Sequence, residues 1–244
     1  SNNEVIKEFI TDENGNYSLS TKLPEIYKIE FAPGGIDIST GKEVKNTMTN
    51  ISTKEETMKN NVVNVSPITS VMSMLIESNE NKIDKNIIND SLELISSTFN
   101  IDKSKINSDY INEKNESMAK ITNQLEVITN TISNTIEDSN VTKDKVYKSV
   151  TNVIRNTSKN IQKIDLSDND FINNGMDQVK EDNVIDISEN IISNVKNYIG
   201  HVNKDIKDLV GDFDTIMSES IKLNVASFDV INTNLNNFVE SIID

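Results

Sequence analysis

The amino-acid sequence predicts a mainly α-helical protein, α+β overall, in which a small β-rich N-terminal region precedes a multi-helix bundle. Two observations predict this organisation. All three prolines and four of the seven glycines lie at or before Pro67, and both residue types are typical of turns and loops. After Pro67 the apolar residues recur every three or four positions, which places them on one face of a helix. We therefore expect a β-rich region at residues 1–65 and a helical bundle at residues 66–244.

The composition indicates a folded, acidic protein with a lean core. Apolar residues make up 35% of the chain, below the roughly 45–50% of typical domains. The formal net charge is −15, and such a chain repels nucleic acid and anionic membrane surfaces. Cysteine is absent, which excludes disulfides and thiolate metal sites. No apolar run reaches the ~20 residues of a membrane-spanning helix. We expect no nucleic-acid partner and no direct membrane insertion in this segment.

The first part of the β-rich region is expected to contain a tight turn. Asp12 and Asn14 can bond to their own backbone, and Gly15 can adopt the positive φ that turns often require. Residues 17–20 alternate between apolar and polar positions, as a half-buried strand does. We therefore predict a turn at residues 11–16 followed by a short strand.

The clearest predicted strand covers residues 26–31, in which alternate side chains would face the interior: Tyr27, Ile29 and Phe31. Another strand is expected at residues 62–65. The loop that follows the clearest strand is expected to be shaped by three glycines and one aspartate, namely Gly34, Gly35, Asp37 and Gly41.

The bundle is expected to begin at Ser66 and Pro67. A serine hydroxyl at the N-cap accepts a hydrogen bond from a backbone N–H that has no partner within the helix. Proline is tolerated at the first helical position because its missing N–H would have had no partner there. This pair of residues therefore predicts a helix that starts at residue 67.

The longest helix is expected at about residues 114–138, where apolar residues step by three and four: Met118, Ile121, Leu125, Ile128, Ile132 and Ile136. Other helices are expected at about 84–99, 142–164 and 183–199, with two more between about 202 and 243 that meet near 222–227. Gly175 is expected to interrupt the acidic segment 165–182, and Gly200 to end the helix before it.

The chain offers little for catalysis. His201 is the single histidine, and no serine lies in a Gly-x-Ser-x-Gly turn that would pair with it. Neither phosphate-binding glycine motif is present. We expect no enzymatic activity, and we expect His201 to be a surface residue at a helix end.

Two runs of oxygen-bearing side chains are candidate calcium sites. The first run contains Asp12, Asn14 and Asn16, and the second contains Asp165, Asp168 and Asp170. Calcium takes six to eight oxygen ligands, and neither run is followed by a bidentate glutamate at the spacing of a complete loop. The alternatives are a hairpin turn for the first run and a solvated helix cap for the second. No other metal or cofactor is expected.

Three segments, taken in order, resemble one family of proteins. Residues 11–19 read TDENGNYSL, residues 34–41 read GGIDISTG and residues 65–71 read VSPITSV. The order and spacing resemble large bacterial cell-surface and adhesin-like proteins, in which a prealbumin-like (carboxypeptidase regulatory-like) β module runs into a helical segment. The resemblance covers about residues 8–105. Ile68 replaces the family's leucine after proline, Ser70 and Val71 replace its Thr-Leu, and the upstream strands of the module are absent from this sequence.

The resemblance implies a non-catalytic structural or adhesive segment of a bacterial cell-surface or secreted protein, with an extracellular location. Its partner would be a protein or glycan at the cell surface, and the targeting sequence is not part of this chain. Two alternatives stay open, a virion or assembly component and a helical domain that binds a ligand or peptide. A polar residue inside an apolar stripe would favour the binding domain, but Asn130 and Asn134 are expected on the polar face.

Overall fold

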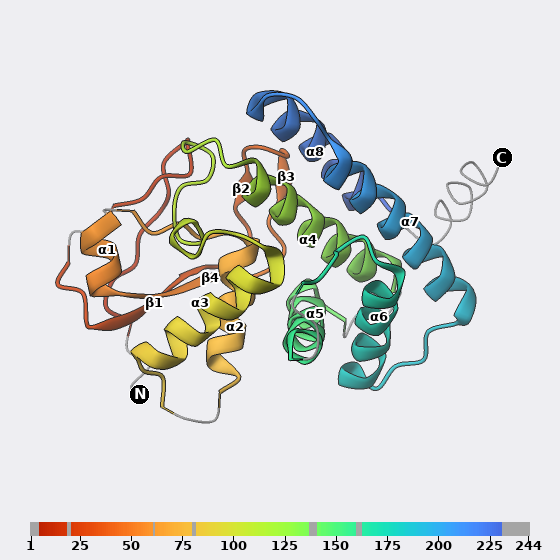
Figure 1. The fold of residues 1–244 in the computed structure, drawn as a ribbon, viewed down its shortest axis with the longest axis horizontal. Helices are drawn as coiled ribbons and strands as arrows, with labels where there is room; N and C mark the ends of the chain where they lie inside the picture. Colours follow the sequence, from red (N-terminus) through yellow and green to blue (C-terminus); the bar gives the residue numbers. More distant parts are fainter. Residues whose placement is uncertain are drawn as a thin grey trace.

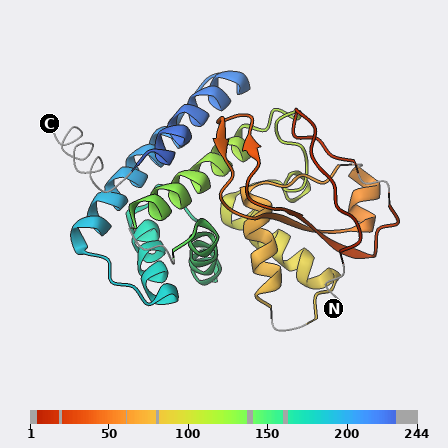
Figure 2. The ribbon, with the colours of Figure 1, turned by 180° about the vertical axis from the view of Figure 1, so that it is seen from behind.

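The structure is a computed structural model that describes residues 5–18, 21–60, 62–79, 82–136, 141–159 and 163–230. Within these ranges it contains four short strands and eight α-helices, so the predicted mainly α, α+β class is confirmed. Figure 1 shows β1 and β4 together with α1, α2 and α3 in one half of the molecule and α4 to α8 in the other, with β2 and β3 beside α4 where the halves meet. Figure 2 shows the same division from behind.

The larger sheet consists of two antiparallel strands, β1 (Ile26–Phe31) and β4 (Met48–Thr53). The predicted strand at residues 26–31 is confirmed, with Tyr27 and Ile29 buried and Phe31 partly buried. Between the two strands, β2 (Ile36–Asp37) and β3 (Lys42–Glu43) form a small antiparallel hairpin. The segment expected to be a plain loop is therefore a hairpin.

Other expectations for this region are wrong. Residues 17–18 are not in a strand, and residues 19–20 lie outside the described residues. Residues 62–65 are not a strand, because β4 occupies the place beside β1 and Val63 packs instead against Tyr27 and Ile29. The sequence predicted neither β4 nor the helix that follows it, α1 (Lys54–Asn60). β4 reads MTNIST, which lacks the apolar alternation of a half-buried strand.

The helix α2 (Pro67–Glu77) covers the second edge of β4 with hydroxyl groups. Ser70 Oγ accepts from the Thr49 N–H at 3.0 Å, and Ser73 Oγ accepts from the Ile51 N–H at 2.9 Å. Thr69 Oγ1 donates to the Thr49 carbonyl at 3.0 Å. An edge strand that buries its N–H groups needs such partners. These three hydroxyls therefore allow a two-stranded sheet to lie against the bundle.

Replacing Ser73 by alanine is expected to lower the free energy of unfolding by about 1–3 kcal/mol, because the buried Ile51 N–H loses its acceptor. The measurement is urea-induced unfolding followed by far-UV circular dichroism. Ser97, an exposed serine of α3 whose hydroxyl bonds only to its own helix, is the matched control. Equal losses for the Ser73→Ala and Ser97→Ala variants would contradict the edge-covering role.

The predicted helix start at Ser66 and Pro67 is confirmed. Ser66 Oγ accepts from the Thr69 N–H at 3.3 Å, and Thr69 Oγ1 accepts from the Ser66 N–H at 2.8 Å. This reciprocal pair is a capping box in which threonine stands at the third helical position. Pro67 is the first residue of the helix, as predicted.

The Ser66→Ala variant is expected to unfold with a free energy lower by about 1 kcal/mol, because the Thr69 N–H loses the cap. Pro67→Ala is the neighbouring control and is expected to be mild, since the first helical position tolerates many residues. Thermal unfolding of the two variants beside the parent protein measures both effects. An unchanged melting curve for Ser66→Ala would remove the capping role.

The remaining helices form the bundle around α4. Their bounds are α3 (Lys85–Phe99), a short 3-10 helix η1 (Lys103–Lys105), α4 (Glu116–Thr135), α5 (Lys143–Ser158), α6 (Asn169–Asn183), α7 (Glu189–Asp208) and α8 (Phe213–Phe228). α4 contacts α2, α5, α7 and α8, and Figure 1 shows it in the middle of the helical half. Met118, Leu125, Ile128 and Ile132 of its predicted stripe are buried, and Ile121 is partly buried.

Both glycines expected to break helices lie inside them. α6 continues through Gly175, and α7 continues through Gly200 to Asp208. A Cβ on Gly200 would lie 2.9 Å from Asn169 Oδ1 at the start of α6, so this glycine permits close packing of two helices. The break between α7 and α8 falls at residues 209–212, where Gly211 has φ 142°. The expected boundary near 222–227 is therefore inside α8, and the segment 183–199 spans the end of α6 and the start of α7.

The Gly175→Ala variant is expected to raise the free energy of unfolding by about 0.5–1 kcal/mol, because alanine loses less backbone entropy in a helix than glycine does. A Cβ at this position would meet nothing within 4 Å. Gly200→Ala serves as the comparison, and its free energy of unfolding is expected to rise less, since its Cβ must displace Asn169 Oδ1. Urea denaturation measures both, and a loss of stability for Gly175→Ala would contradict this account.

The apolar core is shared between the two halves. Ile51 of β4 belongs to the same buried cluster as the core residues of the helices. A second, smaller cluster of Tyr27, Ile29 and Val63 lies on the other side of the sheet. The division of the chain into two domains near residue 65 stays a prediction.

Candidate functional site: a buried polar network

The first calcium candidate is a self-bonded turn. Asp12 Oδ1 accepts from the N–H groups of Asn14 at 2.9 Å and Asn16 at 2.8 Å. Backbone donors of this kind favour the ionised carboxyl and hold the pKa of Asp12 below its usual range. Gly15 has φ 76°, and its N–H donates to the Asp12 carbonyl at 3.0 Å. The predicted turn is therefore confirmed.

The second calcium candidate surrounds the start of α6. Asp168 is the N-cap and accepts from the N–H groups of Asp170 at 2.7 Å and Phe171 at 3.1 Å. Asp165 binds Lys207 Nζ at 2.6 Å and the Ser167 N–H at 2.9 Å. Asp170 lies exposed in the first turn. In the described part of the chain, no three His, Cys, Asp or Glu side chains gather as a metal-binding group would.

The predicted loop residues shape the β2–β3 hairpin. The Asp37 carboxylate accepts from the Ser39 N–H at 2.8 Å and from the Thr40 hydroxyl at 3.0 Å. The Gly41 N–H donates to the Asp37 carbonyl at 2.7 Å, and Gly41 has φ 67°. At the base, Gly34 donates to and Gly35 accepts from the backbone of residue 44. Asp37 therefore stabilises the tip of the hairpin through these hydrogen bonds.

His201 lies on the surface, as predicted, but in the interior of α7 rather than at a helix end. Its Nε2 is 3.5 Å from Asp205 Oδ2, one turn further along the helix. This exposed pair lies on the solvent side of α7 and belongs to no cluster of catalytic groups among the contacts of the described residues.

Among the ion pairs of the described residues, the most deeply buried one lies between α4 and α5. Glu126 of α4 has a side chain 13% exposed, and Lys143 at the start of α5 has one 7% exposed. Lys143 Nζ lies 2.5 Å from Glu126 Oε2, and the Tyr147 hydroxyl donates to Glu126 Oε1 at 2.5 Å. Lys143 and Tyr147 are four residues apart, so they lie on one face of α5. The Lys143 ammonium also lies 5.5 Å from the centre of the Phe228 ring.

The phenol of Tyr147 is held neutral by this environment. Burial raises the pKa of Tyr147 well above its ordinary value, and the negative charge of Glu126 raises it further. A neutral phenol is a hydrogen-bond donor, which is the role that the Glu126 carboxylate requires of it. Each oxygen of Glu126 thus has its own donor, and the charges of the ion pair cancel.

A seam of amides and hydroxyls extends this network along α4 and α8. Asn130 Nδ2 donates to Asn224 Oδ1 and to Ser227 Oγ, each at 3.2 Å. Asn224 Nδ2 donates to Asn123 Oδ1 at 3.1 Å. Asn134 donates to the carbonyl of residue 228 at 2.9 Å. Asn130 and Asn134 lie on a polar face of α4, as expected, but this face is not solvated, because α8 packs over it through polar side chains of its own.

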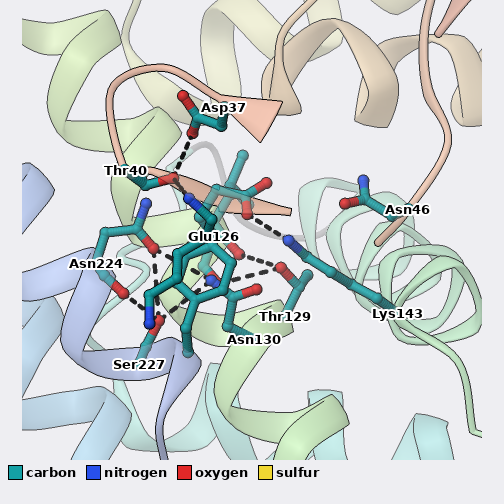
Figure 3. A network of polar contacts seen from close by, with 12 residues as sticks. Asp37, Thr40, Asn46, Glu126, Thr129, Asn130, Lys143, Asn224 and Ser227 are labelled. Atoms are coloured by element: carbon teal, nitrogen blue, oxygen red, sulfur yellow. Dashed lines mark hydrogen bonds and ion pairs between the residues drawn. The ribbon is translucent and has the colours of Figure 1, made fainter. Parts of the chain in front are cut away.

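The β2–β3 hairpin lies over the same region. Figure 3 shows Asp37 and Thr40 of the hairpin, and Asn46 after it, on one side of Glu126, Lys143 and Asn224. Two contacts hold residues 42–47 against the helices. Lys42 Nζ lies 3.0 Å from Asp229 Oδ1, and the Thr47 N–H donates to Asp144 Oδ1 at 2.8 Å. The hairpin therefore joins the end of α8 to the first turn of α5.

Sequence reasoning did not find this network. Glu126 and Lys143 stand beside apolar stripes, where most charges are solvated. Asn224 and Ser227 lie in a helix whose buried face is largely polar. The one usable signal was the lysine four residues before a tyrosine, Lys143 and Tyr147, and that spacing is too common to select a site.

None of the helices that the structure describes combines the length and the apolar composition that a membrane span requires. A comparison of the chain with protein-family models, curated proteins and solved structures finds no match.

Proposed function

We propose that this chain is a non-catalytic structural or adhesive segment of a bacterial cell-surface or secreted protein. The observation that carries the proposal is that the polar groups of the buried network are already bonded to one another. Glu126, Lys143 and Tyr147 bind one another across α4 and α5. A buried carboxylate that acts on a substrate needs a free oxygen or an exchangeable proton, whereas here both oxygens hold helices in place.

Two further features support the proposal. Both carboxylates that begin the acidic runs, Asp12 and Asp165, stabilise local chain geometry. The net charge of −15 gives a strongly solvated surface, which suits a protein outside the cell. The resemblance of residues 11–19, 34–41 and 65–71 to adhesin-like surface proteins supports an extracellular location with a protein or glycan partner.

The test is protease shaving of intact cells that make the protein, followed by detection of its peptides by mass spectrometry. Residues 5–18 are mostly exposed and provide accessible cleavage sites. We expect release of peptides from unbroken cells, with a cytoplasmic enzyme of the same cells as the control that is released only on lysis. Protection of the chain until lysis would overturn the extracellular location.

One observation favours a second candidate, a helical domain that binds a small ligand or peptide. Asn130 places a polar side chain inside the packed interface between α4 and α8, and polar groups of this kind orient ligands in bundles. A thermal-shift screen with small molecules and peptides tests it, with an Asn130→Ala variant as the control for binding at the seam. A ligand that stabilises the parent protein but not this variant would support the second candidate over the first.

A further inference from the structure

The dipeptide Asn-Gly occurs twice in this chain, and the two copies have different backbone conformations. Asn14 and Gly15 lie at the exposed tip of the turn, whereas Asn174 and Gly175 lie inside α6. We propose that Asn14 is a site of spontaneous deamidation, and that the fold protects Asn174 from the same reaction. This proposal does not depend on the proposed function.

The reaction uses groups of the chain and water alone. The Gly15 backbone nitrogen loses its proton to solvent base and forms a bond to the Asn14 side-chain carbonyl carbon. The side-chain nitrogen leaves as ammonia, and a five-membered succinimide ring remains. One water molecule then opens the ring at either carbonyl, which yields aspartate or isoaspartate. No oxidant or reductant takes part, and the product carries one additional negative charge.

The turn leaves the reacting groups accessible. Asn14 and Gly15 are both exposed, and a Cβ on Gly15 would meet nothing within 4 Å. The nitrogen that must attack is restrained by one hydrogen bond, from the Gly15 N–H to the Asp12 carbonyl at 3.0 Å. Exposed turns of this kind open at little cost in free energy. The structure therefore allows the Asn14 side chain to reach the Gly15 nitrogen after a small local opening.

The second dipeptide is held in a regular helix. Gly175 is buried, and its N–H lies in the middle of α6, where each N–H donates to the carbonyl four residues earlier. Attack on the Asn174 side chain requires that bond to break and the helix to unwind locally. The Asn174 side chain is itself exposed, so solvent access does not distinguish the two sites. Backbone conformation does.

Modification of Asn14 would act on the packing of the N-terminal segment. The turn connects Phe9 to Tyr17, whose rings stack at 4.9 Å, and both rings pack against Phe31 of β1. Isoaspartate inserts one additional atom into the backbone, so Asp12 can no longer accept from residues 14 and 16 as it does now. The new carboxylate also repels that of Asp12. Formation of isoaspartate therefore loosens the packing of residues 9–17 against β1.

The first experiment measures the reaction by peptide mapping of the purified protein during incubation at mildly alkaline pH. We expect a mass gain of about 1 Da at residue 14, labelling of this peptide by an isoaspartate methyltransferase, and a rate that rises with pH. Asn14 is expected to react at least about tenfold faster than Asn174, because the helix must open first. Asn14→Gln is expected to abolish the gain at this site, and Asn174→Gln is expected to leave it unchanged. Equal rates at the two sites, or no gain at Asn14, would overturn the proposal.

The second experiment separates the effect of charge from that of the backbone. Hydrogen exchange of amides in residues 9–17 is compared among fresh protein, aged protein and the Asn14→Asp variant, which adds charge but keeps the backbone length. We expect faster exchange in aged protein than in Asn14→Asp. If these amides exchange at the same rate in aged and in fresh protein, the predicted loosening of residues 9–17 is contradicted.

Discussion

The Glu126→Ala variant is expected to lose about 3–5 kcal/mol of unfolding free energy, because the substitution leaves the Lys143 ammonium buried without its partner. Lys143 Nζ is 2.5 Å from Glu126, and its side chain is 7% exposed, so solvent cannot replace the carboxylate without local opening. The Tyr147 hydroxyl loses its acceptor as well. The measurement is urea-induced unfolding monitored by circular dichroism.

Two controls define what this result means. Glu219→Ala breaks an exposed pair with Lys222, and exposed pairs contribute about 0–1 kcal/mol. The double variant Glu126→Leu with Lys143→Met removes both charges, and it is expected to recover most of the loss because no uncompensated charge remains. A Glu126→Ala variant as stable as Glu219→Ala would show that the ion pair does not hold α4 and α5 together.

The Ile132→Ala variant is expected to lower the free energy of unfolding by about 2–5 kcal/mol, because it removes apolar surface from the centre of the bundle and leaves a cavity. Ile132 is fully buried in α4, which packs against four other helices. Ile121→Ala is the matched control, since the same residue type stands in the same helix but is only partly buried. Denaturant unfolding compares the two variants, and equal losses would contradict the central position of α4.

The helices could be predicted because their signals are local. The stripe from Met118 to Ile132 lies within one helix, and its spacing alone places it on one face. Ser66 and Pro67 mark a helix start through bonds to residues within one turn. Asp12 and Gly15 mark a turn for the same reason. In each case the partners that satisfy the backbone lie a few positions away in the sequence.

The β-region was harder to predict because its partners are distant or polar. β4 is stabilised by hydrogen bonds to Ser70 and Ser73 of α2, and no pattern within the strand predicts those bonds. Gly175 and Gly200 were expected to interrupt helices, but tertiary packing of α6 and α7 outweighs the modest helix penalty of a glycine. The candidate site was missed for a related reason, since Asn130 is polar and only the packing of α8 buries it.

The mainly helical class, the position of α4 and the cap at Ser66 could be read from the amino-acid sequence alone, because short-range periodicity and hydrogen bonding specify them. Which charges are buried depends on how the helices pack in three dimensions. Glu126 and Lys143 meet because α4 packs against α5 at that point, whereas the carboxylate of Asp168 stays at the surface as a helix cap. The burial of a charged or polar side chain depends on which element packs over it, and that element can be distant in the sequence, as α8 is from Asn123 and Asn130 of α4.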